Sequence, residues 1–131
     1  MLEIFGPLIL LMCALQVKHM LADYFLQTKA MLDGRDQYLH LGRAMHAGVH
    51  AGLSVVCFLL VGAPLGFIVA LVVAEWVIHF HIDWWKGWLT SGRDLTPSDA
   101  AYWRASGVDQ ALHQLTYVAM LGLWLWQVTP I

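Results

Sequence analysis

The residues of this chain most able to do chemistry lie in one apolar stretch, residues 65–89. The stretch is long enough to cross a bilayer as a helix, yet it carries ionisable side chains. On a helix, successive members of the series Glu75, His79 and Asp83 differ in direction by about 40°, and Lys86 lies within roughly 20° of His79. The four side chains therefore form one stripe along the helix. Ionisable groups on a spanning helix are costly unless they face a polar interior or bind something. The stripe therefore indicates a functional site.

Each of the apolar stretches in the chain carries a pair of ionisable residues four positions apart. The pairs are His19 with Asp23, His46 with His50, His79 with Asp83, and Asp109 with His113. A spacing of four puts both members on one helix face, as when a helix offers two ligands to one metal. The pairs lie near the ends of the first and third stretches and near the starts of the second and fourth. Antiparallel packing would therefore bring all of them to one level.

Such a set of donors predicts a divalent metal centre. Five imidazoles and three carboxylates at one level, with Glu75 a turn deeper, exceed the four ligands of a single zinc ion. The surplus suits two ions, or one ion with carboxylates that orient the imidazoles. No thiolate lies at this level, which favours Zn, and then Mn or Fe, over Cu(I). The predicted metal ligands are His19, Asp23, His46, His50, His79, Asp83 and His113.

The same residues predict a metal-dependent hydrolase whose centre opens to the cytoplasmic leaflet. Metal lowers the pKa of a bound water, and Glu75 or Asp109 would take the proton. Lys86 and Arg43, at the mouth, could hold an anionic headgroup or phosphate. The predicted substrate is lipid-like or interfacial.

Other interpretations of this pattern remain open. A buried His and Asp network without metal could tie the helices together in a non-catalytic scaffold, and a metal-ion or proton conduit or sensor would use the same residue types. A di-iron oxygenase is a further alternative. His40 and His81 lie off the stripes and are assigned to packing, and Lys18 is expected to reach the headgroups.

Composition places these stretches in a membrane. Of 131 residues, 60% are hydrophobic and only 12% are charged, about half the charge of a soluble domain, and the mean hydropathy is +0.63. A formal net charge of -2 and the lack of a basic stripe argue against nucleic acid as a partner. We expect one integral-membrane domain over residues 1–131, with an uncleaved N-terminus, membrane lipid as its surroundings, and homo-oligomers possible in principle.

The predicted fold is all-α, a four-helix transmembrane bundle with up-down-up-down topology. The spans run over about residues 2–27, 43–61, 65–89 and 109–128, with a short interfacial helix between the third and fourth that starts near Thr96 and ends near Arg104. Lys and Arg cluster in the first and third connections and are missing from the second connection and both termini. The positive-inside rule then predicts that the first and third connections are cytoplasmic and that the termini face outward.

Several of these residues carry a resemblance to a known family. The run from Lys18 to Thr28 contains His-x2-Ala-Asp-x2-Leu-Gln-Thr, and His46 with His50, then His79-x3-Asp83-x2-Lys86, then Asp109-Gln110-x2-His113 follow it. This pattern resembles that of the small bacterial and phage membrane proteins grouped as domain of unknown function 3307, over nearly the whole chain. The chain is also similar, in architecture and residue type, to membrane-bound metal-dependent hydrolases, a likeness that implies hydrolysis.

Overall fold

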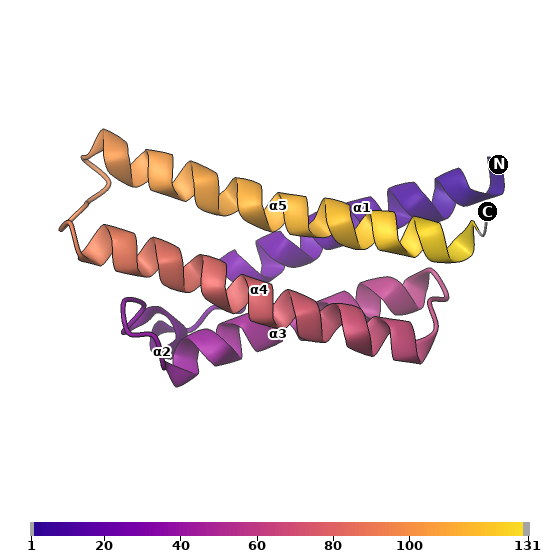
Figure 1. Ribbon diagram of the computed structural model, residues 1–131, viewed down its shortest axis with the longest axis horizontal. Coiled ribbons are helices and arrows are strands. Elements are labelled where there is room, and N and C mark those ends of the chain that lie inside the picture. Colours follow the sequence, from indigo (N-terminus) through magenta and orange to yellow (C-terminus); the bar gives the residue numbers. More distant parts are fainter. Residues whose placement is uncertain (1, 130–131) are drawn as a thin grey trace.

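Residues 2–129 of the computed structural model form five helices and no strand (Figure 1). In chain order the helices are α1 (Leu2–Tyr24), α2 (Lys29–Leu32), α3 (Leu41–Leu60), α4 (Leu65–Ser91) and α5 (Ala100–Val128). The predicted all-α class is confirmed. The first predicted span ends three residues early, at Tyr24, and the third continues two residues further, to Ser91.

Three helices are long and apolar enough to cross a membrane. They are α1 from Glu3 to Tyr24, α3 and α4. This property indicates a membrane protein, as the composition predicted. Among residues 2–129, α5 falls outside this set, because polar residues such as Gln110, His113 and Gln127 lower its mean hydropathy.

The long helices pack so that each contacts two others. Helix α4 packs against α3 and α5, and α1 packs against the same two helices. The beginning of α1, the end of α5 and the α3–α4 turn lie at one end of the molecule, while the other connections lie at the opposite end (Figure 1). The four predicted pairs lie in the halves of the helices nearest those other connections, so the fold delivers them to one level.

A tight turn makes α3 and α4 antiparallel neighbours. Gly62 has a positive φ of 68°, its N–H donates to the carbonyl of Leu59 at 3.0 Å, and the N–H of Ala63 donates to that of Phe58 at 3.1 Å. These two bonds cap the last carbonyls of α3 and end the helix. Pro64, whose φ of −63° suits its ring, directly precedes α4. Residues 62–64 thus form a tight connection between the second and third predicted spans.

The separate interfacial helix predicted before the fourth span is wrong. Residues 100–128 form one continuous helix that Ser106 and Gly107 do not interrupt. A glycine inside a helix costs only about 0.5–1 kcal/mol of stability, which the rest of the helix can offset. Asp99, and not Thr96, stands at the N-cap position. The backbone N–H and the hydroxyl of Thr96 donate to the carboxylate of Asp99 at 2.8 and 2.9 Å, and these hydrogen bonds lower the pKa of Asp99.

The connection between α1 and α3 is folded against the start of α3 by Arg43. This guanidinium is 1% exposed and donates to the backbone carbonyls of Arg35, of Gln37 at 2.6 Å and of Tyr38 at 2.9 Å. A buried guanidinium has to place its N–H groups on acceptors, and here the loop supplies them. Arg43 therefore holds the loop and does not project into the mouth of the site, which corrects the prediction made for it.

An apolar core fills the half of the molecule nearest the α3–α4 turn. Its buried members are Leu11, Leu15, Cys57, Phe58, Ala63, Ile68, Leu71, Tyr117, Met120 and Trp124. They come from all four long helices, so the hydrophobic packing sets the separation of these helices. The same packing therefore controls how closely the polar side chains approach at the opposite end.

Gly42 offers a test of how α2 packs against the start of α3, because a Cβ added there would overlap the backbone oxygen of Ala30 and lie 2.8 Å from the His40 ring. We expect Gly42→Ala to lower the free energy of unfolding by about 1–3 kcal/mol, measured from thermal unfolding in detergent. The matched control is Gly52→Ala in the same helix, where nothing lies within 4 Å of the added Cβ. Equal unfolding temperatures for the two variants would contradict this account of α3.

Candidate metal centre

All seven predicted metal ligands lie together in the structure. They form three overlapping groups whose donor atoms lie within 4.8 Å of one another: His46, His50 and His79; His19, Asp23 and His50; His79, Asp83 and His113. Every long helix contributes to the cluster. The imidazoles are 0–6% exposed, so the ring nitrogens face each other in place of water. We call these seven residues the His/Asp cluster.

Three imidazoles contact the carboxylate of Asp23, near the end of α1. The Nε2 atom of His19 lies 3.1 Å from its Oδ2, and those of His46 and His50 lie 3.3 and 3.1 Å from its Oδ1. Two of these rings come from α3 and one from α1 itself. The carboxylate therefore joins two helices through a single pair of oxygen atoms.

Asp83, on α4, has the same arrangement. The Nε2 atoms of His46 and His79 lie 3.6 and 3.3 Å from its Oδ2, and that of His113 lies 3.3 Å from its Oδ1. His46 contacts both carboxylates and so links the two halves of the cluster. His50 and His79 connect the halves a second time, with ring centroids 3.9 Å apart.

The spacing of these atoms suits donors that share an ion. Two ligands at about 2.1 Å from one ion and at the tetrahedral angle lie about 3.4 Å apart. The nitrogen–oxygen distances in the cluster run from 3.1 to 3.6 Å, at or beyond the long end for an ordinary N–H···O bond. Within residues 2–129, moreover, Nε2 of His79 makes no hydrogen bond at all despite being fully buried.

Tyr117 is a member of the site that the sequence reasoning missed. Its hydroxyl lies 2.8 Å from Nδ1 of His19 and 3.5 Å from Nδ1 of His50, and the residue is 1% exposed. The Asp23 carboxylate and the side-chain oxygen of Gln110, which lies 3.1 Å from Nε2 of His19, only accept hydrogen bonds. The Nε2–H groups of His19 and His50 therefore donate to these oxygens, and the Tyr117 hydroxyl donates to the nearer Nδ1, that of His19. The spacing of four from His113 continues the stripe on α5 and was the signal that could have found it.

A buried ion pair lies one turn deeper than the His/Asp cluster. Lys18 and Glu75 are 3% and 1% exposed, and Lys18 donates to Oε1 of Glu75 and, at 3.3 Å, to the backbone carbonyl of His50. The expectation that Lys18 reaches the headgroups is wrong, because a carboxylate buried among apolar side chains requires a cation beside it. Glu75 is thus engaged by Lys18 and contributes to none of the donor groups, and its role as a proton acceptor stays a prediction.

Two adjoining pockets open onto the cluster. A pocket of about 170 Å³ reaches Asp23, His46, Asp83 and His113, and a second of about 410 Å³ lies beyond it. Both pockets are lined by three of the same residues: Arg35, Asp83 and Lys86. The cluster is therefore reached from the end that carries the α1–α3 and α4–α5 connections.

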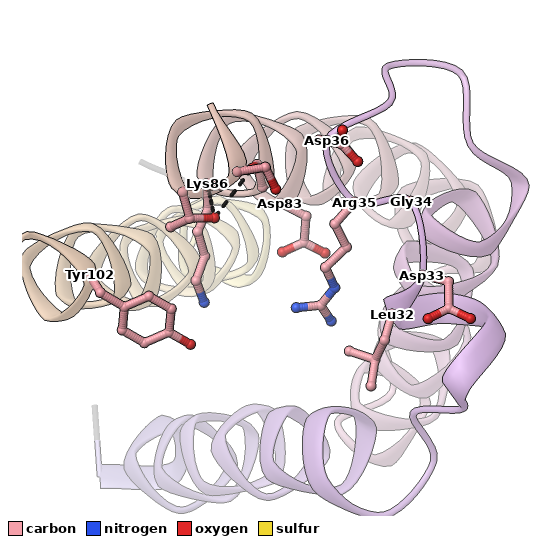
Figure 2. A pocket seen from close by; sticks show the side chains of 11 residues that line it. Leu32, Asp33, Gly34, Arg35, Asp36, Asp83, Lys86 and Tyr102 are labelled. Atoms are coloured by element: carbon pink, nitrogen blue, oxygen red, sulfur yellow. Dashed lines mark hydrogen bonds between the residues drawn. The ribbon is translucent and has the colours of Figure 1, made fainter. Parts of the chain in front are cut away.

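Two cations lie at this mouth. Lys86, predicted there, lies 3.1 Å from Oδ2 of Asp109, and Arg35 donates to Oε1 of Gln27 at 2.6 Å. Figure 2 shows Arg35 and Lys86 projecting into the same space, and Asp33, Asp36 and Asp83 also line this pocket. Arg35 thus occupies the place that the sequence analysis gave to Arg43. The position of Arg35 depends on the conformation of the α1–α3 loop. Loop residues show no helical periodicity from which that position could have been predicted.

The two remaining histidines lie outside the cluster, as predicted. His81 faces the loop, where its Nε2 lies 3.0 Å from the hydroxyl of Tyr38, and its Nδ1 donates to the carbonyl of Val77 at 2.7 Å. His40 precedes α3 and packs against Gly34 and Gly42. Both side chains serve local packing.

These observations describe an all-α protein with three helices able to cross a membrane and a buried cluster of imidazoles and carboxylates reached from one end. Residues 9–130 match the family described as "Protein of unknown function (DUF3307)", and the chain belongs to that family. The resemblance noted in the sequence is thereby confirmed. No curated protein and no solved structure matches the chain.

The buried ion pair can be tested by substitution. Lys18→Met leaves the Glu75 carboxylate without its cation, and we expect a loss of about 3–5 kcal/mol in the free energy of unfolding, followed by chemical denaturation in detergent. The double variant Lys18→Met/Glu75→Leu removes both charges and should recover most of that loss. A single variant as stable as the wild type would show that the pair does not support the fold.

Proposed function

We propose that this protein is a metal-dependent hydrolase embedded in the bacterial inner membrane, with its reaction centre at the cytoplasmic end. One observation carries the proposal: two carboxylates, Asp23 and Asp83, each face three imidazoles at distances of 3.1–3.6 Å inside a cluster that a pocket connects to the outside. A purely structural network would not require that opening. The pocket provides a path for a substrate.

In this proposal the four long helices form an up-down-up-down transmembrane bundle. Helix α5 supplies the fourth span over about residues 109–128, shielded by its contacts with α1 and α4. The excess of Lys and Arg in the first and third connections supports a cytoplasmic position for the mouth, with both termini outside. The exposed side chains of α1, α3 and α4 are mostly apolar, with Glu3, Gln16 and His81 among the exceptions, and this supports contact with lipid.

The donors suit one or two divalent ions. His19 and His50 with Asp23, and His79 and His113 with Asp83, would make up two ligand sets, and His46 lies between them. Imidazole and carboxylate donors without a thiolate favour Zn, with Mn or Fe as alternatives. A divalent ion held here would lower the pKa of a bound water to near neutrality and supply a nucleophile.

The protein's own side chains would handle the proton and the substrate charge. Asp109 accepts from Lys86 and Gln110 through Oδ2, while its Oδ1 lies 3.6 Å from His113 and makes no hydrogen bond within residues 2–129. That oxygen is free to accept the proton lost by the water. Lys86 and Arg35 would hold an anionic group of a lipid-like or interfacial substrate at the mouth.

The alternative of a conduit has less support. The apolar core around Phe58, Ile68 and Trp124 fills the molecule between the cluster and the far end, and it offers no polar lining for an ion. The alternative of a scaffold with a metal-free network is addressed directly by the metal content of the purified protein.

The first test is metal content. Protein purified in detergent without added metal should carry Zn, Mn or Fe by elemental analysis. His79→Ala should bind that metal at least about 10–100-fold more weakly, because that is the loss of affinity caused by removing a residue that merely orients a ligand, and His79 is proposed as a ligand itself. His81→Ala is the matched control, two residues along the same helix and outside the cluster. Negligible metal in the wild type would leave only the structural network.

The second test is catalysis. With metal bound, Asp109→Asn should lower kcat on a soluble aryl phosphodiester by about 10²–10⁴-fold while the metal content stays unchanged, since the proton acceptor is lost and the metal ligands are not. Asp94→Asn is the control, because Asp94 is exposed, lines neither pocket at the mouth, and adopts a positive φ that asparagine tolerates. Full activity in Asp109→Asn would remove this residue from the mechanism.

A further inference from the structure

The two halves of the His/Asp cluster differ in how their polar atoms are satisfied. One half, which we call the α1–α3 set, consists of His19, Asp23 and His50. The other half, the α4–α5 set, consists of His79, Asp83 and His113. Each set offers two imidazoles and one carboxylate, which can provide three ligands to a tetrahedral ion. The hydrogen bonds around each set show which of the two is free to bind one.

The α1–α3 set is already hydrogen-bonded. His19 uses both ring nitrogens, because its Nδ1 accepts from the Tyr117 hydroxyl at 2.8 Å and its Nε2–H donates to the side-chain oxygen of Gln110 at 3.1 Å. The Nε2–H of His50 donates to Asp23 at 3.1 Å. Within residues 2–129 no buried side-chain nitrogen or oxygen of this set lacks a partner. An ion can use Nε2 of His19 or His50 only after the proton there has moved and these bonds are lost.

The α4–α5 set leaves a buried nitrogen unsatisfied. His79 is 2% exposed, and among residues 2–129 its Nε2 finds no hydrogen-bond partner. That atom lies 3.3 Å from Oδ2 of Asp83, and Nε2 of His113 lies 3.3 Å from Oδ1 of the same carboxylate. Two ligands of one tetrahedral ion lie about 3.4 Å apart, so both distances suit a shared ion. A buried nitrogen without a partner is costly, and an ion bound beside Asp83 would satisfy it.

The proposed proton acceptor lies beside the α4–α5 set. Oδ1 of Asp109 lies 3.6 Å from Nε2 of His113 and has no hydrogen-bond partner in the described part of the chain, residues 2–129. A general base has to lie within hydrogen-bond reach of the water that it deprotonates, directly or through one further water. The smaller pocket reaches Asp83, His113 and Asp109 but, of the α1–α3 set, only Asp23. A water bound to an ion in the α4–α5 set would therefore have both a base and access to the pocket.

The third group of donors, His46 with His50 and His79, does not compete with the α4–α5 set. It shares His79 with that set, and its second ring, His50, already donates to Asp23. Nε2 of His46 lies 3.3 Å from Asp23 and 3.6 Å from Asp83. His46 therefore lies between the two sets and connects them.

We infer that the protein binds a single divalent ion through His79, Asp83 and His113, and that the α1–α3 set is a hydrogen-bonded support that holds no metal. This inference rests on the proposed hydrolase and assigns its ion to one of the two ligand sets. Two of the ligands belong to α4 and one to α5, so the ion cross-links these two helices. Tyr117 and Gln110 then hold His19 in place and do not orient a metal ligand.

The test is Zn²⁺ binding by matched variants. Metal-free protein in detergent is dialysed against a series of zinc chloride concentrations, and the zinc bound per chain is measured by elemental analysis. The wild type should bind one ion. His113→Ala and Asp83→Asn should bind it at least about 10–100-fold more weakly, since even a residue that only orients a ligand contributes that much. His19→Ala and Asp23→Asn make the same changes in the α1–α3 set and should bind zinc with the affinity of the wild type.

A milder variant covers the case in which His19→Ala or Asp23→Asn fails to fold, which circular dichroism of the metal-free protein would show. Tyr117→Phe removes only the hydroxyl that binds His19. If the ion bound to the α1–α3 set, this change would weaken zinc binding by about 10–100-fold, whereas we expect no change. Two zinc ions per chain, no zinc at all, or equal losses in the two sets of variants would overturn the inference.

The outcome separates this inference from the hydrolase itself. Zinc bound in the expected pattern by a protein without hydrolytic activity would support the ion site and reject the hydrolase. Metal-dependent hydrolysis of a soluble aryl phosphodiester that survives in His113→Ala and is lost in His19→Ala would support the hydrolase and overturn the ion site.

Discussion

The structure depends on one constraint: ionisable side chains on apolar helices must find each other. A carboxylate or imidazolium taken out of water costs several kcal/mol unless it is paired. Here the cost is offset at one level of the molecule, where Asp23 and Asp83 each collect three imidazoles. Helices that slid or rotated relative to one another would break these contacts, so the polar cluster fixes the register that the apolar core leaves loose.

The apolar and polar halves of the molecule act together. Packing around Phe58, Ile68 and Trp124 sets the distance between helices, and Lys18 with Glu75 forms the boundary between that packing and the cluster. Tyr117 belongs to both regions, because its ring lies in the core and its hydroxyl contacts His19 and His50. Tyr117 thus joins the packing of the core directly to the geometry of the cluster.

The mouth is held in place by different structural elements from those that hold the cluster. It is built from a loop and from helix ends, and its shape depends on Arg43, whose buried guanidinium binds the loop carbonyls. That arrangement frees Arg35 to project into the pocket beside Lys86. The cluster lies on packed helices and the mouth lies partly on a loop, and loops in general tolerate sequence change that packed helices do not.

The sequence by itself determined the four long helices and the level of the cluster. Helical periodicity puts His19 with Asp23, and His79 with Asp83, on single faces, and the position of each pair along its helix predicts one common level; all seven predicted donors do lie together. Only the tertiary structure decided the partners. Whether Lys18 meets lipid or Glu75, and whether Arg43 or Arg35 reaches the mouth, depends on distances between segments far apart in the chain, and helical periodicity reports only on neighbours within a few turns.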